Sequence, residues 1–75
     1  MIKIRVYTKE DQEGGYNGTE LRNLRPRRYM NGWSFEQLLK YIKEELYWED
    51  IREEDVMTIE IYEKGSWTNY VERGE

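Results

Sequence analysis

Residues 33–46 decide the fold, and they read WSFEQLLKYIKEEL. Ser34 followed three positions later by Gln37 matches a capping box, and Trp33 with Leu38 matches the hydrophobic staple around such a helix start. Beyond the start, apolar residues recur at helical spacing at Phe35, Leu38, Leu39, Ile42 and Leu46. The pattern predicts an amphipathic helix that begins after Ser34, ends near Tyr47 or Trp48 and buries one stripe.

Segments with strand periodicity lie on both sides of this helix. Residues 1–8 alternate apolar and polar side chains, and residues 56–62 do so again, which predicts two half-buried strands. Lys64-Gly65 is a hairpin turn signal, and residues 67–71 form the predicted returning strand. A two-residue turn would pair Tyr62 with Trp67, Ile61 with Thr68, and Ile59 with Tyr70.

Residues 9–32 have no single interpretation. Residues 9–20 are rich in charge and glycine, which favours a turn or a mobile loop. Leu21 and Leu24 are three positions apart, which fits a helical turn that Pro26 would stop. Residues 27–30 fit a short strand beside the first one equally well as an irregular arm.

Together these elements predict an α+β fold in one domain, residues 1–75. One helix packs on one face of a small, mostly antiparallel sheet of three or four strands. The order along the chain is strand, helix, strand, strand, with an optional second strand between the first strand and the helix. We find no internal repeat and no interdomain linker.

The composition excludes several classes of function. The chain has no Cys and no His, which removes disulfides, thiolate and imidazole metal ligands, and the usual general base near neutral pH. A domain of 75 residues also has little room for the desolvating cleft that paired catalytic carboxylates need. We therefore expect no catalysis, no cofactor and no metal site. With no signal peptide and no long apolar run, we expect a cytoplasmic protein that does not contact a membrane.

Charge is unevenly distributed along the chain. The formal net charge is −4, but residues 1–30 carry +3 and residues 31–75 carry −7. We call residues 44–55 the acidic segment because seven of its twelve positions are carboxylates: Glu44, Glu45, Glu49, Asp50, Glu53, Glu54 and Asp55. Such a segment can be a solvated face, a surface that docks on a basic partner, or a cation site. The alternating ligands and central glycine of a calcium loop are absent.

The chain is also rich in aromatic residues, with seven Tyr, three Trp and one Phe. Tyr and Trp are enriched among the residues that dominate the energy of protein interfaces, although they can equally belong to the core. We therefore predict a non-catalytic protein-binding module whose partner is a larger protein with a basic surface. A homodimer through the sheet face is a further expectation. The predicted contact residues are Glu45, Trp48, Glu49, Asp50, Glu53, Glu54, Asp55, Tyr62 and Trp67.

Two alternative functions stay open. The arginine-rich arm 22–29 could contact phosphates and stack a base, which predicts a small nucleic-acid-binding regulator. The residues concerned are Arg22, Arg25, Arg27, Arg28 and Tyr29. The negative net charge opposes this hypothesis, because nonspecific nucleic-acid binding depends on neutralising phosphates. A structural homo-oligomeric subunit, for example in a virion, is the other alternative.

In general composition the chain resembles small open reading frames of phages and archaeal viruses, which are short, acidic, aromatic-rich and without Cys or His. The resemblance assigns no role to any individual residue. The most concrete version of the predicted protein-binding module is an inhibitor of the anti-defence type, which would act on a nucleic-acid-handling protein in the cytoplasm of a host cell.

Overall fold

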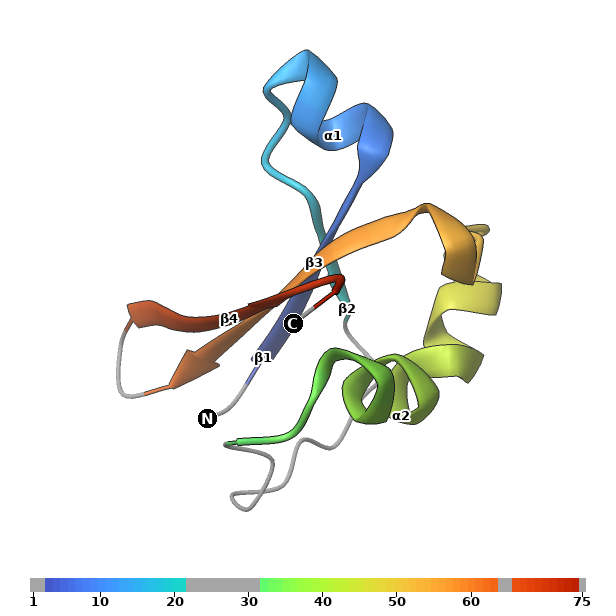
Figure 1. Cartoon of the computed structure of the whole chain (residues 1–75). Helices are drawn as coiled ribbons and strands as arrows, with labels where there is room; N and C mark the ends of the chain where they lie inside the picture. Colours follow the sequence, from blue (N-terminus) through green and yellow to red (C-terminus); the bar gives the residue numbers. More distant parts are fainter. Residues whose placement is uncertain (1–2, 22–31, 64–65, 75) are drawn as a thin grey trace.

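The computed structural model describes residues 3–21, 32–63 and 66–74, with the backbone alone for residues 63 and 66–69. A four-stranded antiparallel sheet has the strand order β2-β1-β3-β4, and α2 lies against one of its faces (Figure 1). The elements are β1 (Lys3–Thr8), α1 (Lys9–Gly14), β2 (Thr19–Leu21), α2 (Phe35–Trp48), the 3-10 turn η2 (Glu53–Asp55), β3 (Val56–Glu63) and β4 (Ser66–Glu72). The α+β fold and its single main helix are confirmed.

Helix α2 forms as its sequence predicts. The Ser34 hydroxyl accepts a hydrogen bond from the Gln37 amide at 3.2 Å, and the Gln37 side chain accepts one from the Ser34 amide at 2.9 Å. These two bonds satisfy amides that the first turn of a helix otherwise leaves unpaired. The five predicted apolar positions are all buried: Phe35, Leu38, Leu39, Ile42 and Leu46.

The core lies between this apolar stripe and the inner face of the sheet. The sheet contributes Ile4, Val6, Leu21, Val56, Ile59 and Ile61, which are all at most 4% exposed. Trp33 and Tyr41 close one side of the core, with ring centroids 5.7 Å apart in an edge-to-face arrangement. Such pairs stabilise beyond the area they bury, by roughly 0.5–1.5 kcal/mol. Phe35 is the one aromatic residue among the buried core residues that the structure describes, and Trp33 and Tyr41 pack against their edge.

The hairpin register differs in part from the prediction. Tyr62 does pair with Trp67, but the pairing shifts between Ile61 and Tyr62. Beyond the shift, Ile61 lies opposite Asn69 and Ile59 lies opposite Val71, so the predicted partners Thr68 and Tyr70 are wrong. The extra residue of this irregularity moves Tyr70 to the outer face, opposite Glu60.

Residues 9–20 are not a plain loop, which corrects the prediction for this region. Thr8 and Asp11 form a capping box, with bonds of 3.2 and 2.9 Å, and α1 follows. After it, β2 pairs with β1, so Leu21 belongs to a strand and not to a helical turn. Gly18 makes this return tight: its φ is +75°, and a Cβ there would lie 2.6 Å from the Val6 carbonyl oxygen. Only glycine fits such a position without a shift of the backbone.

Candidate functional site

Helix α2 ends in a cap that has an aspartate at the position usually occupied by glycine. The Ile51 amide donates to the Leu46 carbonyl at 2.9 Å and the Asp50 amide donates to the Tyr47 carbonyl at 3.1 Å. These are the two bonds of a Schellman motif, whose left-handed residue is most often glycine. Here that residue is Asp50, with φ +59°. Half-buried Ile51 packs against the core and completes the motif with an apolar contact.

Two aromatic side chains stand exposed at the same end. Tyr47 is 79% exposed and Trp48 is 76% exposed, although each ring has apolar area that burial would stabilise. Their ring centroids are 5.9 Å apart in an edge-to-face arrangement. Trp48 was predicted as a contact residue, whereas Tyr47 was not. Its position outside the apolar stripe of α2 was the signal that could have identified it.

The predicted carboxylates follow this pair along the chain, and Asp50 and Glu53 line a hollow together with Tyr47. Glu49, Asp50 and Glu54 are exposed, and Glu45, Glu53 and Asp55 are half-buried. The last turn of α2 contains no basic residue. Carboxylates at the C-terminus of a helix oppose its dipole, at a cost of roughly 0.3–1 kcal/mol each. Within the described part of the chain, the buried Glu45 Oε2 accepts no hydrogen bond.

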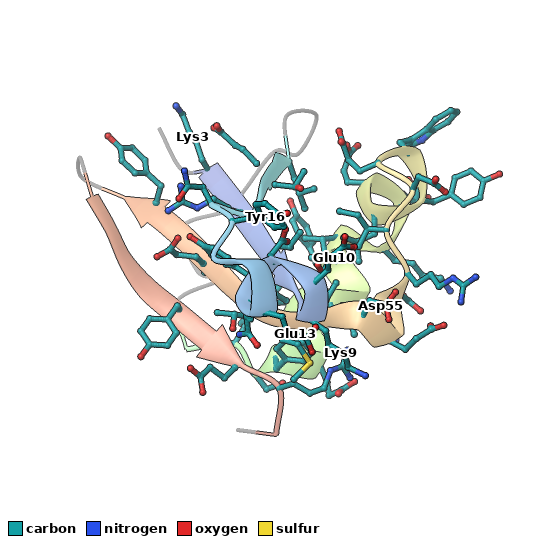
Figure 2. The ribbon with its side chains drawn as sticks, turned by 90° about the horizontal axis from the view of Figure 1, so that it is seen from above. Lys3, Lys9, Glu10, Glu13, Tyr16 and Asp55 are labelled. Carbon is teal, nitrogen blue, oxygen red and sulfur yellow. The ribbon has the colours of Figure 1, made fainter. Side chains whose placement is uncertain are left out.

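Helix α1 adds a second acidic wall that the sequence did not indicate. A cleft of about 700 Å³ separates α1 from the 50–55 segment. Figure 2 shows Glu10 and Lys9 of α1 on the side of that helix where Asp55 lies, whereas Lys3 is at the far end of β1. The cleft is lined by Thr8, Lys9, Glu10, Asp11, Glu13, Thr19, Asp50, Ile51, Arg52 and Asp55. Five carboxylates thus face two cations.

Arg73 fixes the position of η2. Its guanidinium donates to the Glu53 carbonyl at 2.6 Å and to the Val56 carbonyl at 2.9 Å, and it lies 4.8 Å from the centre of the Phe35 ring. The charged fork therefore holds both ends of the turn that presents the acidic side chains. No sequence signal pointed to this role, because the contact joins residues far apart in the chain.

The outer face of the sheet carries a separate polar cluster. The Arg5 side chain donates to Glu60 Oε1 at 2.6 and 3.0 Å, and the Tyr7 hydroxyl donates to the same oxygen at 3.1 Å. Burial raises the pKa of Tyr7 above its usual value, and the Glu60 carboxylate raises this pKa further. The cluster neutralises its own charges, which makes it a structural feature of the sheet and not an electrostatic site.

Two of the predicted contact residues do not join the acidic segment. Tyr62 lies near the opposite end of β3 from Asp55, roughly 23 Å away at the usual rise per residue of a strand. Trp67 is opposite Tyr62 in the hairpin, and its side chain lies outside the described residues. The arginine-rich arm, with Arg22, Arg25, Arg27, Arg28 and Tyr29, also lies outside them.

Two further properties concern the described residues alone. In residues 3–21, 32–63 and 66–74, no three acidic side chains converge in a way that could hold a metal ion. None of the helices in these ranges has the length and apolar character needed to cross a membrane.

Comparison with models of known protein families, with curated proteins and with solved structures finds no match to this chain.

Proposed function

We propose that this chain is a non-catalytic protein-binding module that docks the acidic segment and its aromatic pair on a basic surface of a larger protein. The observation that carries the proposal is the pair itself. Tyr47 and Trp48 are both more than three-quarters exposed, and they stand among carboxylates at the end of α2. In an isolated domain, exposed aromatic rings leave apolar area in water, and neighbouring carboxylates repel one another. Both features suit an interface with a cationic partner.

The local chemistry supports the same proposal. Asp50 occupies a left-handed position that costs a non-glycine residue roughly 1–2 kcal/mol. Its carboxylate and that of Glu49 also stand at the negative end of the α2 dipole. Residues that oppose the local backbone preference or the helix dipole in this way are concentrated at functional sites. A basic partner would convert each of these repulsive charges into an attractive one.

Binding would proceed in two physical stages. The negative field of the acidic segment steers a basic surface toward it, which raises the rate of association at low salt. Trp48 and Tyr47 then lose their exposure against the partner and slow dissociation, since buried aromatic anchors dominate interface energies. The most concrete form of the proposal is an inhibitor that occupies the nucleic-acid-binding surface of an enzyme and takes the place of phosphates.

The test begins with capture of the partner from a host lysate and elution with a salt gradient. Association of the purified pair is then followed by stopped-flow kinetics over a range of salt concentrations. The variant E49Q/D50N/E53Q/E54Q should associate more slowly and with a flatter salt dependence, and Trp48→Ala should mainly accelerate dissociation. Glu36→Gln is the matched control, because this exposed carboxylate is in the first turn of the same helix.

Unchanged kinetics in the neutralised variant would contradict the proposal. So would turnover of a small molecule by the purified chain alone. An assembly of this chain with itself, stable in high salt, would instead favour a structural subunit. A shift of labelled DNA or RNA at low salt, abolished by replacing Arg25, Arg27 and Arg28, would favour the nucleic-acid-binding alternative.

A further inference from the structure

A groove beside the aromatic pair has an apolar floor. It encloses about 510 Å³ and is lined by Lys43, Leu46, Tyr47, Asp50, Ile51, Arg52 and Glu53. Leu46 is buried and Ile51 is half-buried, so the groove reaches down to the core, while the exposed Tyr47 ring forms a wall. Its volume is in the range of pockets that accept side chains or small ligands, about 300–1,000 Å³. The groove can accept an apolar side chain.

This groove adjoins the acidic cleft beside α1. Asp50, Ile51 and Arg52 line both hollows, so the two share a wall. The cleft side carries carboxylates from two distant parts of the chain, Glu10 and Glu13 of α1 and Asp55 of η2. A hollow with an apolar floor therefore lies beside a negatively charged one. A ligand that fills both needs an apolar residue and positive charges in sequence.

We infer that the bound element is a projecting, extended segment of the partner in which lysine or arginine residues flank an apolar residue. The apolar residue occupies the groove, and the cationic residues lie along the α1 wall and the acidic segment. A flat basic surface cannot enter two adjoining hollows, and a nucleic acid would bring phosphates against carboxylates. The inference rests on the proposed function and names the partner chemistry at that site.

Arg52 provides a test of whether the ligand is positively charged. It is exposed and lines both hollows, where its positive charge opposes a basic ligand. Its removal should therefore tighten binding of a basic segment. A ligand held by apolar contact alone would bind the Arg52→Gln variant with unchanged affinity.

The experiment uses the full chain and a fluorescent peptide of nine residues, in which arginines flank a central leucine. Fluorescence anisotropy gives its affinity at two salt concentrations. A peptide with serine in place of the leucine should bind about tenfold more weakly, because the groove then gains no apolar burial. Glu10→Gln should weaken binding about threefold, E10Q/E13Q should weaken it further, and Arg52→Gln should strengthen it about threefold.

Glu36→Gln is again the matched control, since Glu10 and Glu36 are both exposed acidic residues in the first turn of a helix. Glu36 lies roughly 20 Å along α2 from Asp50, beyond the Debye length of about 8–10 Å, so its removal should change affinity less than about twofold. Equal affinity for the leucine and serine peptides would overturn the inference. So would a loss in E36Q as large as that in E10Q.

The inference and the proposed function can fail separately. If E49Q/D50N/E53Q/E54Q slows association of the captured partner while E10Q/E13Q and Arg52→Gln leave it unchanged, the docking surface stands and the extended segment is wrong. If a single-stranded oligonucleotide binds the chain more tightly than the peptide and displaces it, the inference is also wrong.

Discussion

Asp50 has a backbone conformation that is unfavourable for a residue other than glycine, and its side chain lines both hollows of the proposed docking surface. Its backbone has φ +59°, a conformation that glycine adopts without a steric cost. Its amide and the next one complete the Schellman bonds to Tyr47 and Leu46, so the backbone geometry is required. The carboxylate itself makes no contribution to that geometry. The carboxylate lines both hollows, where the proposed docking function would use its charge.

Replacing Asp50 with glycine should therefore separate stability from binding. Asp50→Gly should raise the free energy of unfolding by about 1 kcal/mol, because it relieves the left-handed strain and removes a charge at the negative end of the helix dipole. Urea denaturation measures this change. The same variant should bind a basic peptide more weakly. Asp50→Asn is the control for the charge alone, and a lower stability of Asp50→Gly would contradict this explanation.

Tyr7 gives a prediction for alkaline pH. Burial and the Glu60 carboxylate raise its pKa in the folded protein above the unfolded value of about 10. A group with a raised folded pKa contributes stability that is complete below the unfolded pKa and is lost as the pH rises through the folded pKa. Wild-type stability should thus fall above pH about 10 more steeply than that of Tyr7→Phe. Denaturation curves at increasing pH test this, and parallel declines would count against it.

Among the elements, those with a long buried pattern could be predicted, whereas α1, which buries no residue, and β2, which has three residues and buries only Leu21, could not. Helix α2 has both a capping box and an apolar stripe, so its two ends were predicted closely. Helix α1 has a capping box at Thr8 and Asp11 and a left-handed Gly15 after it, but it buries no residue. Hydrophobic periodicity is the main signal for a helix, and α1 has none. The acidic wall of the cleft was missed for the same reason.

The hairpin illustrates a second limit of the sequence. Alternation along residues 56–62 predicts a strand, and a two-residue turn predicts the pairing of Tyr62 with Trp67. Nothing in the local pattern marks the irregularity that follows, because a bulge depends on how two strands twist together. One added residue was enough to place Val71 opposite Ile59 and to turn Tyr70 outward.

The turn η2 depends on an element distant in sequence, which leads to a prediction about Arg73. Arg73→Met keeps an apolar stem over Phe35 but leaves the Glu53 and Val56 carbonyls without their donor. The free energy of unfolding should fall by about 2–3 kcal/mol, as expected for lost charge-assisted hydrogen bonds. Hydrogen exchange of the Asp55 amide, which donates to the Arg52 carbonyl, should accelerate. Unchanged exchange would show that η2 holds its shape without this contact.

At the scale of the molecule, the folded charge distribution differs from that along the sequence. The sequence suggested a basic first part and an acidic second part. In the structure, Glu10 and Glu13 from the first part line the same cleft as Asp50 and Asp55 from the second. The fold therefore concentrates carboxylates from both parts at one end of the sheet. We expect the same concentration of charge that would attract a basic partner to destabilise the isolated chain through repulsion.

This repulsion can be measured in the absence of any partner. The variant E49Q/D50N/E53Q/E54Q changes the formal net charge from −4 to 0 and removes two carboxylates from the negative end of the α2 dipole. Its free energy of unfolding at low salt should exceed that of the wild type by about 1–2 kcal/mol. For a domain of this size, each kcal/mol corresponds to a Tm increase of about 4–8 °C.

Salt identifies the cause of that difference. Added salt screens repulsion between exposed charges, so it should raise the Tm of the wild type and bring it toward that of the neutralised variant. Glu36→Gln should not raise the Tm at low salt, because Glu36 is a carboxylate at the favourable end of the helix dipole and far from the cleft. A neutralised variant with equal or lower stability at low salt would mean that the carboxylates of the acidic segment do not repel one another. These carboxylates would then need no basic partner to offset their repulsion, whatever the exposure of Trp48.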